Sequence, residues 1–114
     1  MCVNKDIGEN KMNANLNEDS LTYLFKAITT LETVDECRRF FEDLCTVPEL
    51  KAMSQRLMVA KLLNNKVVYS KIVEETGAST ATISRVNRSL NYTSCEGYAL
   101  VFDRLKNLED KEDE

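Results

Sequence analysis

The 114-residue chain has no histidine and no tryptophan, one proline and only three glycines. Because glycine and proline are the residues that most often interrupt helices, their scarcity favours an all-α fold. A zinc site would have to rely on cysteine alone, and no two of the four cysteines form a C-x-x-C pair. The sequence also lacks a glycine-rich phosphate loop and the surroundings of a catalytic cysteine. We therefore expect no enzyme activity, no metal site and no cofactor.

Long apolar runs are missing as well. No uninterrupted stretch of 18 apolar residues occurs, so a membrane-spanning segment is not expected. The N-terminal residues lack the apolar stretch of a secretory signal, and we expect the chain to stay in the cytoplasm. In that reducing compartment the cysteines are interpreted as buried, reduced thiols, with zinc binding and disulfide formation as open alternatives. The cysteines are Cys2, Cys37, Cys45 and Cys95.

The net charge of −4 conceals an uneven distribution of charge along the chain. Residues 18–49 contain eight acidic and three basic side chains, whereas residues 50–90 contain seven basic and two acidic ones. The second segment therefore carries a local charge of +5 inside an acidic protein. Such a bias marks the part of the chain where an anion such as DNA would bind.

The spacing of apolar residues divides the chain into three parts. Residues 1–17 are polar and aperiodic, which predicts a disordered leader, and residues 109–114 predict a frayed acidic tail. Between them, residues 18–108 repeat apolar side chains at helical spacing. This central part predicts one domain of about six helices.

Two capping boxes mark the start of consecutive helices. In Thr33–Glu36 and again in Thr46–Glu49, threonine and glutamate stand three residues apart, so that each side chain can bond to the backbone at a helix N-terminus. The helix after the second box is expected to end near Leu63, because the following Asn64 and Asn65 tolerate the conformation of a helix end.

Residues 69–90 predict two short helices joined by a tight turn, the arrangement of a helix-turn-helix. In the first helix, Ile72 and Val73 are expected to face the core. Gly77 lies where the turn can require a positive φ angle, which glycine adopts without strain. Ser79 is the expected N-cap of the second helix. Val68 has no polar side chain to cap the first helix, which predicts an extended approach to it.

The second helix, from Thr80 to Leu90, is amphipathic. Its inward-facing residues are expected to be Ile83, Val86 and Leu90. The opposite face would present Thr80, Ala81, Ser84, Arg85 and Arg88. Small side chains let a helix enter the major groove, which is about 12 Å wide, and serine, threonine and arginine offer donors to bases and phosphates. The alternative is an ordinary turn and surface helix whose arginines are merely solvated.

The run GASTATISR at Gly77–Arg85 resembles the corresponding stretch of the tryptophan repressor family, and the likeness continues to Leu90. A weaker likeness covers Gln55–Leu63, and the phrase FFEDLCTVPEL is similar to a Trp-repressor-like branch rather than to the classical repressors. The resemblance implies an intertwined homodimer with one core built from both chains. It also implies that Ser70 lies near the DNA groove and that four residues of the second helix approach DNA. These four are Thr80, Ala81, Thr82 and Ser84.

The same resemblance bears on the ligand. Classical members hold L-tryptophan between two arginines, beside a glycine that leaves room for the indole ring. Arg85 matches one arginine, but Gln55 stands where the other is expected. Val86 occupies the glycine position, where its branched side chain would intrude on the ring. We therefore predict that tryptophan is not the corepressor, and the sequence identifies no other small-molecule effector.

These observations favour a sequence-specific regulator of transcription, a repressor, that binds double-stranded DNA as a homodimer. Lys71, Arg85 and Arg88 would neutralise phosphates. The N-terminus of the second helix, at Ser79, would also attract a phosphate. One alternative is a module that uses the same surface to bind protein. Another is a DNA-binding role outside transcription, because helix-turn-helix units serve several functions.

Overall fold

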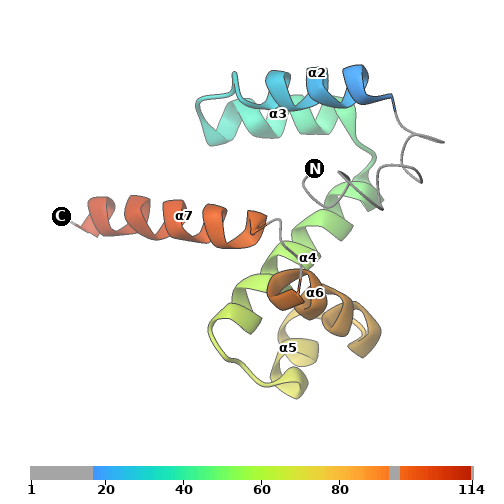
Figure 1. Ribbon diagram of the computed structural model, residues 1–114, viewed down its shortest axis with the longest axis vertical. Coiled ribbons are helices and arrows are strands. Elements are labelled where there is room, and N and C mark those ends of the chain that lie inside the picture. Colours follow the sequence, from blue (N-terminus) through green and yellow to red (C-terminus); the bar gives the residue numbers. More distant parts are fainter. Residues whose placement is uncertain (1–16, 93–95, 114) are drawn as a thin grey trace. The chain divides into compact units, whose positions relative to one another are not determined.

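Six α-helices and no strand occur in residues 17–92 and 96–113, the parts of the chain that the computed structural model describes (Figure 1). The helices are α2 (Glu18–Ile28), α3 (Val34–Leu44), α4 (Val47–Asn64), α5 (Tyr69–Thr76), α6 (Thr80–Tyr92) and α7 (Gly97–Asp113). The predicted all-α fold is thus confirmed. The chain forms two compact units, residues 1–51 and 52–114, whose boundary lies within α4. None of the described helices is both long and apolar enough to cross a membrane.

In the first unit, polar side chains start each helix. The Asn17 side chain accepts hydrogen bonds from the backbone N–H groups of Asp19 and Ser20, so α2 begins at Glu18. At α3, the Thr33 hydroxyl accepts from the Glu36 N–H at 3.0 Å. The Glu36 carboxylate accepts in turn from the Glu32 N–H. In an ideal capping box it would accept from the N–H of the next residue, the N-cap Thr33. The first predicted capping box is therefore present, with its return bond displaced by one residue.

The second capping box is complete. The Glu49 carboxylate accepts from the Thr46 N–H at 2.8 Å, and the Thr46 hydroxyl accepts from the Glu49 N–H at 3.3 Å. The backbone and side-chain hydrogen bonds to Thr46 hold the pKa of Glu49 below its usual value. Because the pKa is lowered on folding, this cap contributes stability above the ordinary glutamate pKa. The contribution is lost as the pH falls through the lowered value.

Neither α2 nor α3 contains a buried residue. The apolar stripe of α2, represented by Leu21, Leu24 and Ile28, is only half-buried. Cys37 and Cys45 are free thiols that are likewise half-buried rather than buried as predicted. Cys2 and Cys95 lie outside the described residues. One copy of the chain thus leaves the apolar surface of this unit incompletely covered.

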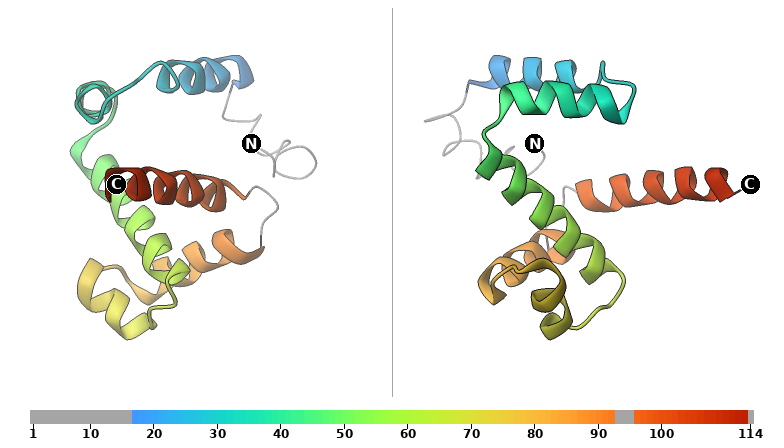
Figure 2. Two further views of the ribbon diagram at one scale, coloured as in Figure 1. Left: turned by 90° about the vertical axis from the view of Figure 1, so that its left-hand side faces the viewer. Right: turned by 180° about the vertical axis from the view of Figure 1, so that it is seen from behind.

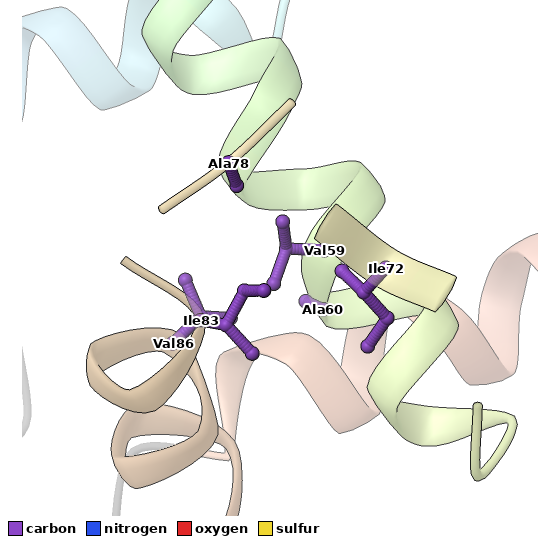
Figure 3. Packing of buried hydrophobic residues seen from close by; sticks show 6 residues of the cluster. All are labelled: Val59, Ala60, Ile72, Ala78, Ile83 and Val86. Atoms are coloured by element: carbon purple, nitrogen blue, oxygen red, sulfur yellow. The ribbon is translucent and has the colours of Figure 1, made fainter. Parts of the chain in front are cut away.

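The second unit has a compact core where α5 and α6 pack on the C-terminal half of α4 (Figure 2). Figure 3 shows the side chains of Val59 from α4, Ile72 from α5 and Ile83 from α6 converging there. All three are fully buried, and Ala78 and Val86 of the same core are each 2% exposed. Residues of α4, α7 and the segment before α5 pack around this core. They are Leu62, Leu63, Val67, Tyr98 and Phe102.

Two sequence expectations need correction in this unit. Val73 was expected to face the core beside Ile72, but it is 37% exposed. Adjacent residues of a helix differ by about 100° in direction, and the side of α5 that packs on the core is the side of Ile72 rather than that of Val73. The expected frayed tail is also wrong, because α7 continues to Asp113. No glycine or proline follows Leu108 to end the helix.

Candidate nucleic-acid interface

The candidate interface is the α5–α6 unit, which comprises α5, the turn at residues 77–79 and α6. As predicted, Val68 precedes α5 in an extended conformation, with φ −71° and ψ 153°, and its side chain makes no capping hydrogen bond. At the other end of α5, Gly77 has φ +73° and its N–H donates to the Val73 carbonyl at 2.9 Å. A Cβ added at Gly77 would meet nothing within 4 Å. The backbone conformation, and not a lack of space, is therefore the reason for glycine.

The Thr76 side chain links the last turn of α5 to the residues that follow it. Its hydroxyl donates to the Ile72 carbonyl at 2.7 Å and accepts from the Ala78 N–H at 3.1 Å. The buried methyl group of Ala78 belongs to the same core cluster as Val59 and Ile83 (Figure 3). These bonds satisfy polar backbone groups at the junction of two helices, where an unpaired group would be costly.

Ser79 caps α6, as the sequence predicts. Its hydroxyl accepts from the Thr82 N–H at 3.1 Å and donates to the Thr82 hydroxyl oxygen at 3.1 Å. The cap places the first residues of α6, with Thr80 leading, at the exposed start of the helix. It also occupies the Thr82 hydroxyl, and Thr82 is half-buried.

The outer face of α6 matches the predicted one. Its five residues, Thr80, Ala81, Ser84, Arg85 and Arg88, are all exposed, while Ile83 and Val86 on the inner face are buried. Ser70 and Lys71 are exposed on α5. Thr82 stands apart from this group because it is half-buried. Contact between any of these side chains and DNA remains a prediction.

The three cations of the α5–α6 unit are available for an external anion. Among the described side chains, the only ion pair is Arg38 with Glu42 of α3, whose atoms are 3.9 Å apart. Lys71, Arg85 and Arg88 therefore have no acidic partner within the described part of the chain. A phosphate could bind them without first breaking an internal salt bridge.

Sequence reasoning missed two features next to this face. The Gln55 side-chain N–H of α4 donates to the Thr76 carbonyl at 3.2 Å. The helix α6 also continues to Tyr92, two residues past its predicted end, and the Asn91 amide donates to the Asn87 side chain at 2.6 Å. For the bond from Gln55 to Thr76, the only signal in the sequence was a polar residue on the face of α4 that packs against α5 and α6.

The fold and this site define an all-helical protein that presents a two-helix unit with a small, polar and basic outer face. A family model described as Trp repressor protein matches residues 19–110. The chain therefore belongs to the Trp repressor family, a family of DNA-binding regulators.

Three relatives refine this assignment. The uncharacterized protein YerC of Bacillus subtilis (strain 168) is 51% identical over 89 residues, covering 78% of this chain and 85% of YerC. A crystal structure of a TrpR-like protein from Eubacterium eligens ATCC 27750 superposes with a TM-score of 0.76 at 50% identity, over 85% of this chain and 95% of that one. A proposed Trp repressor from Staphylococcus aureus gives a TM-score of 0.75 at 48% identity, over 82% and 92% of the two chains. The chain lies in the Trp-repressor-like branch of the family.

Proposed function

We propose that the chain is a homodimeric transcriptional repressor that reads duplex DNA with a helix-turn-helix formed by α5 and α6. The observation that carries the proposal is the outer face of α6, where small polar side chains precede two arginines that form no ion pair with any described residue. Such a face can lie in the major groove while its inner side stays anchored by Ile83 and Val86. Family membership points to the same function.

The residues divide into two roles in this proposal. Lys71, Arg85 and Arg88 neutralise phosphates and set the strength of binding to any DNA. Thr80, Ala81 and Ser84 face the bases, with water bridging part of the distance because their side chains are short. Thr82 supports the cap at Ser79. Ser70 approaches the groove from α5, and the N-terminus of α6 adds a phosphate site.

Uncovered apolar surface supports a dimer. Leu57 and Met58 are 43% and 47% exposed, on the side of α4 away from the α5–α6 core. Together with Phe102 and Leu105 of α7 they line a cavity of about 430 Å³. A helix with apolar residues on two different sides normally buries both of them. A second copy of the chain would cover this groove and the half-buried stripes of α2 and α3, giving one shared core.

Selection from a random pool of duplex DNA, followed by gel retardation, tests this function. We expect a palindromic motif whose half-sites lie about 34 Å apart, and light scattering should show two chains in the free protein. Failure to retard any DNA at low salt would contradict the proposal and favour a protein-binding module. Binding to all sequences with equal affinity would instead favour a DNA-binding role outside transcription.

We further propose that the regulator does not respond to tryptophan. Val86, at the position that corresponds to the glycine of classical members, is 2% exposed and packs in the core. Gln55, at the position of an arginine, bonds to the turn of the same chain. L-tryptophan at millimolar concentration should therefore leave the melting temperature unchanged, because a ligand raises stability only by binding the folded state.

The selected duplex DNA serves as the positive control for this measurement and should raise the melting temperature. A saturable rise with L-tryptophan would show that the core rearranges around the indole, which would contradict the expectation.

A further inference from the structure

Among the described residues, one polar side chain of α4 bonds to the last residue of α5, where the turn of the α5–α6 unit begins. The Gln55 Nε2 group donates to the Thr76 carbonyl oxygen at 3.2 Å, across 21 positions of sequence, in a partly buried environment. Thr76 is the last residue of α5, so its carbonyl has no partner within the helix. The bond thus connects the helix that carries the core to the residue from which the turn departs.

The position of Gln55 on α4 explains how it reaches the turn. Val59 follows Gln55 by four residues, one turn of helix, and is fully buried against α5 and α6. Gln55 therefore extends the face of α4 that packs on the α5–α6 unit, where every buried neighbour is apolar. An apolar residue there would cover the same surface, but it would leave the Thr76 carbonyl without this donor.

The bond also completes a chain of contacts that leads to the N-terminus of α6. The Thr76 hydroxyl accepts from the Ala78 N–H, Gly77 supplies the left-handed residue between them, and Ser79 caps α6. The direction of the chain at Thr76 therefore sets where α6 begins. A shift of this junction would move Thr80 and Ser84 relative to the base edges, whereas flexible arginines could still reach phosphates.

We infer that Gln55 is a positioning residue, which fixes the orientation of α6 for sequence-specific DNA recognition through its hydrogen bond to Thr76. This inference rests on the proposed function. It makes the orientation of α6 depend on a residue of the same chain. Gln55 itself does not contact DNA in this proposal.

The test replaces Gln55 in two ways. In Gln55→Glu an acceptor replaces the donor, and in Gln55→Met the donor is removed at similar length. The matched control is Asn107→Asp, because the Asn107 side chain is exposed on α7 outside the lining of the α4–α7 cavity, makes no hydrogen bond to another described residue, and gives the same change of charge as Gln55→Glu. Affinity is measured for the selected DNA and for random duplex, together with amide hydrogen exchange of the free protein.

Both Gln55 variants should lower affinity for the selected DNA by about tenfold or more, because one partly buried hydrogen bond is lost in each chain of the proposed dimer. Affinity for random DNA should change no more than in Asn107→Asp. In the free variants, exchange of the Gly77 and Ala78 amides should accelerate, while the amides of Val59 and Ala60 stay protected.

Equal loss of affinity for selected and random DNA would overturn the inference, because it would show a general loss of folded protein or of charge attraction. Unchanged exchange at Gly77 and Ala78 would overturn it as well. The exchange experiment needs no DNA. If the unaltered protein bound no DNA while the exchange result held, the proposed function would fail although the structural link between Gln55 and the turn stood.

Discussion

Replacing Ile83 with alanine should lower the free energy of unfolding by about 2–5 kcal/mol, the usual range for truncating a fully buried isoleucine. Ile83 is completely buried and meets Val59 of α4 and Ile72 of α5 (Figure 3). Truncating this side chain would remove the anchor of α6 and leave a cavity at the centre of a small core. The neighbouring side chains would fill that cavity only in part. Chemical denaturation at fixed protein concentration measures the effect, because a dimer's stability depends on concentration.

Two further variants calibrate this result. Ile83→Val removes one methylene group and should cost about 0.5–1.5 kcal/mol. Val101→Ala truncates a residue of α7 that is 43% exposed and should cost much less than Ile83→Ala. A cost for Ile83→Ala no larger than that for Val101→Ala would show that the α5–α6 unit is not held by this core.

The double variant Arg85→Ala/Arg88→Ala should reduce affinity for every duplex DNA by about a hundredfold or more at moderate salt. Both side chains are exposed and lack an internal acidic partner among the described residues, so each can bind a phosphate without first breaking an ion pair. In the proposed dimer each loss counts twice. The slope of log affinity against log salt should therefore become shallower by about 0.9 for each phosphate contact removed, close to 4 in all. Titrations at several salt concentrations measure both quantities.

Arg38→Ala/Arg39→Ala is the matched control, because it also removes two exposed arginines, here from α3, where Arg38 pairs with Glu42. It should leave the salt slope unchanged. Thr80→Val is the complementary variant, and it should change the preferred sequence with little effect on random DNA. An equal effect of this control and of Arg85→Ala/Arg88→Ala would contradict a phosphate-binding role localised on α6. Equal effects of Arg85→Ala/Arg88→Ala and Thr80→Val on both kinds of DNA would contradict the division into phosphate and base contacts.

Local signals were sufficient to predict much of the candidate site. The left-handed residue at Gly77, the cap at Ser79 and the uncapped start at Val68 each depend on neighbouring residues in the chain, and all three are present. The exposed and buried faces of α6 follow from helical periodicity. Thr82, which only the family resemblance places near DNA, is half-buried and its hydroxyl accepts a hydrogen bond from the Ser79 cap, so its contact with DNA stays a prediction. Periodicity assigns a side chain to a face, but it does not show which polar groups bond to each other.

The contacts between distant parts of the chain could not be predicted in the same way. The bond from Gln55 to Thr76 joins residues 21 positions apart, and no local pattern specifies it. The choice of Ile72 over Val73 for the core depends on how α5 lies against α4. The helical end of the chain was also missed, because charged residues such as Glu109 suit both a helix and a disordered tail.

The sequence by itself determined that the chain is all-α, that two helices joined by a glycine turn follow residue 68, and that their outer face is small, polar and basic. These properties depend on residues a few positions apart, where spacing and capping chemistry act directly. Only the tertiary structure decided which side of α4 packs on the α5–α6 unit, which side stays uncovered, and that Gln55 bonds to the turn. Those features arise from packing between segments distant in sequence, where many arrangements share one hydrophobic pattern and shape and hydrogen bonding select among them.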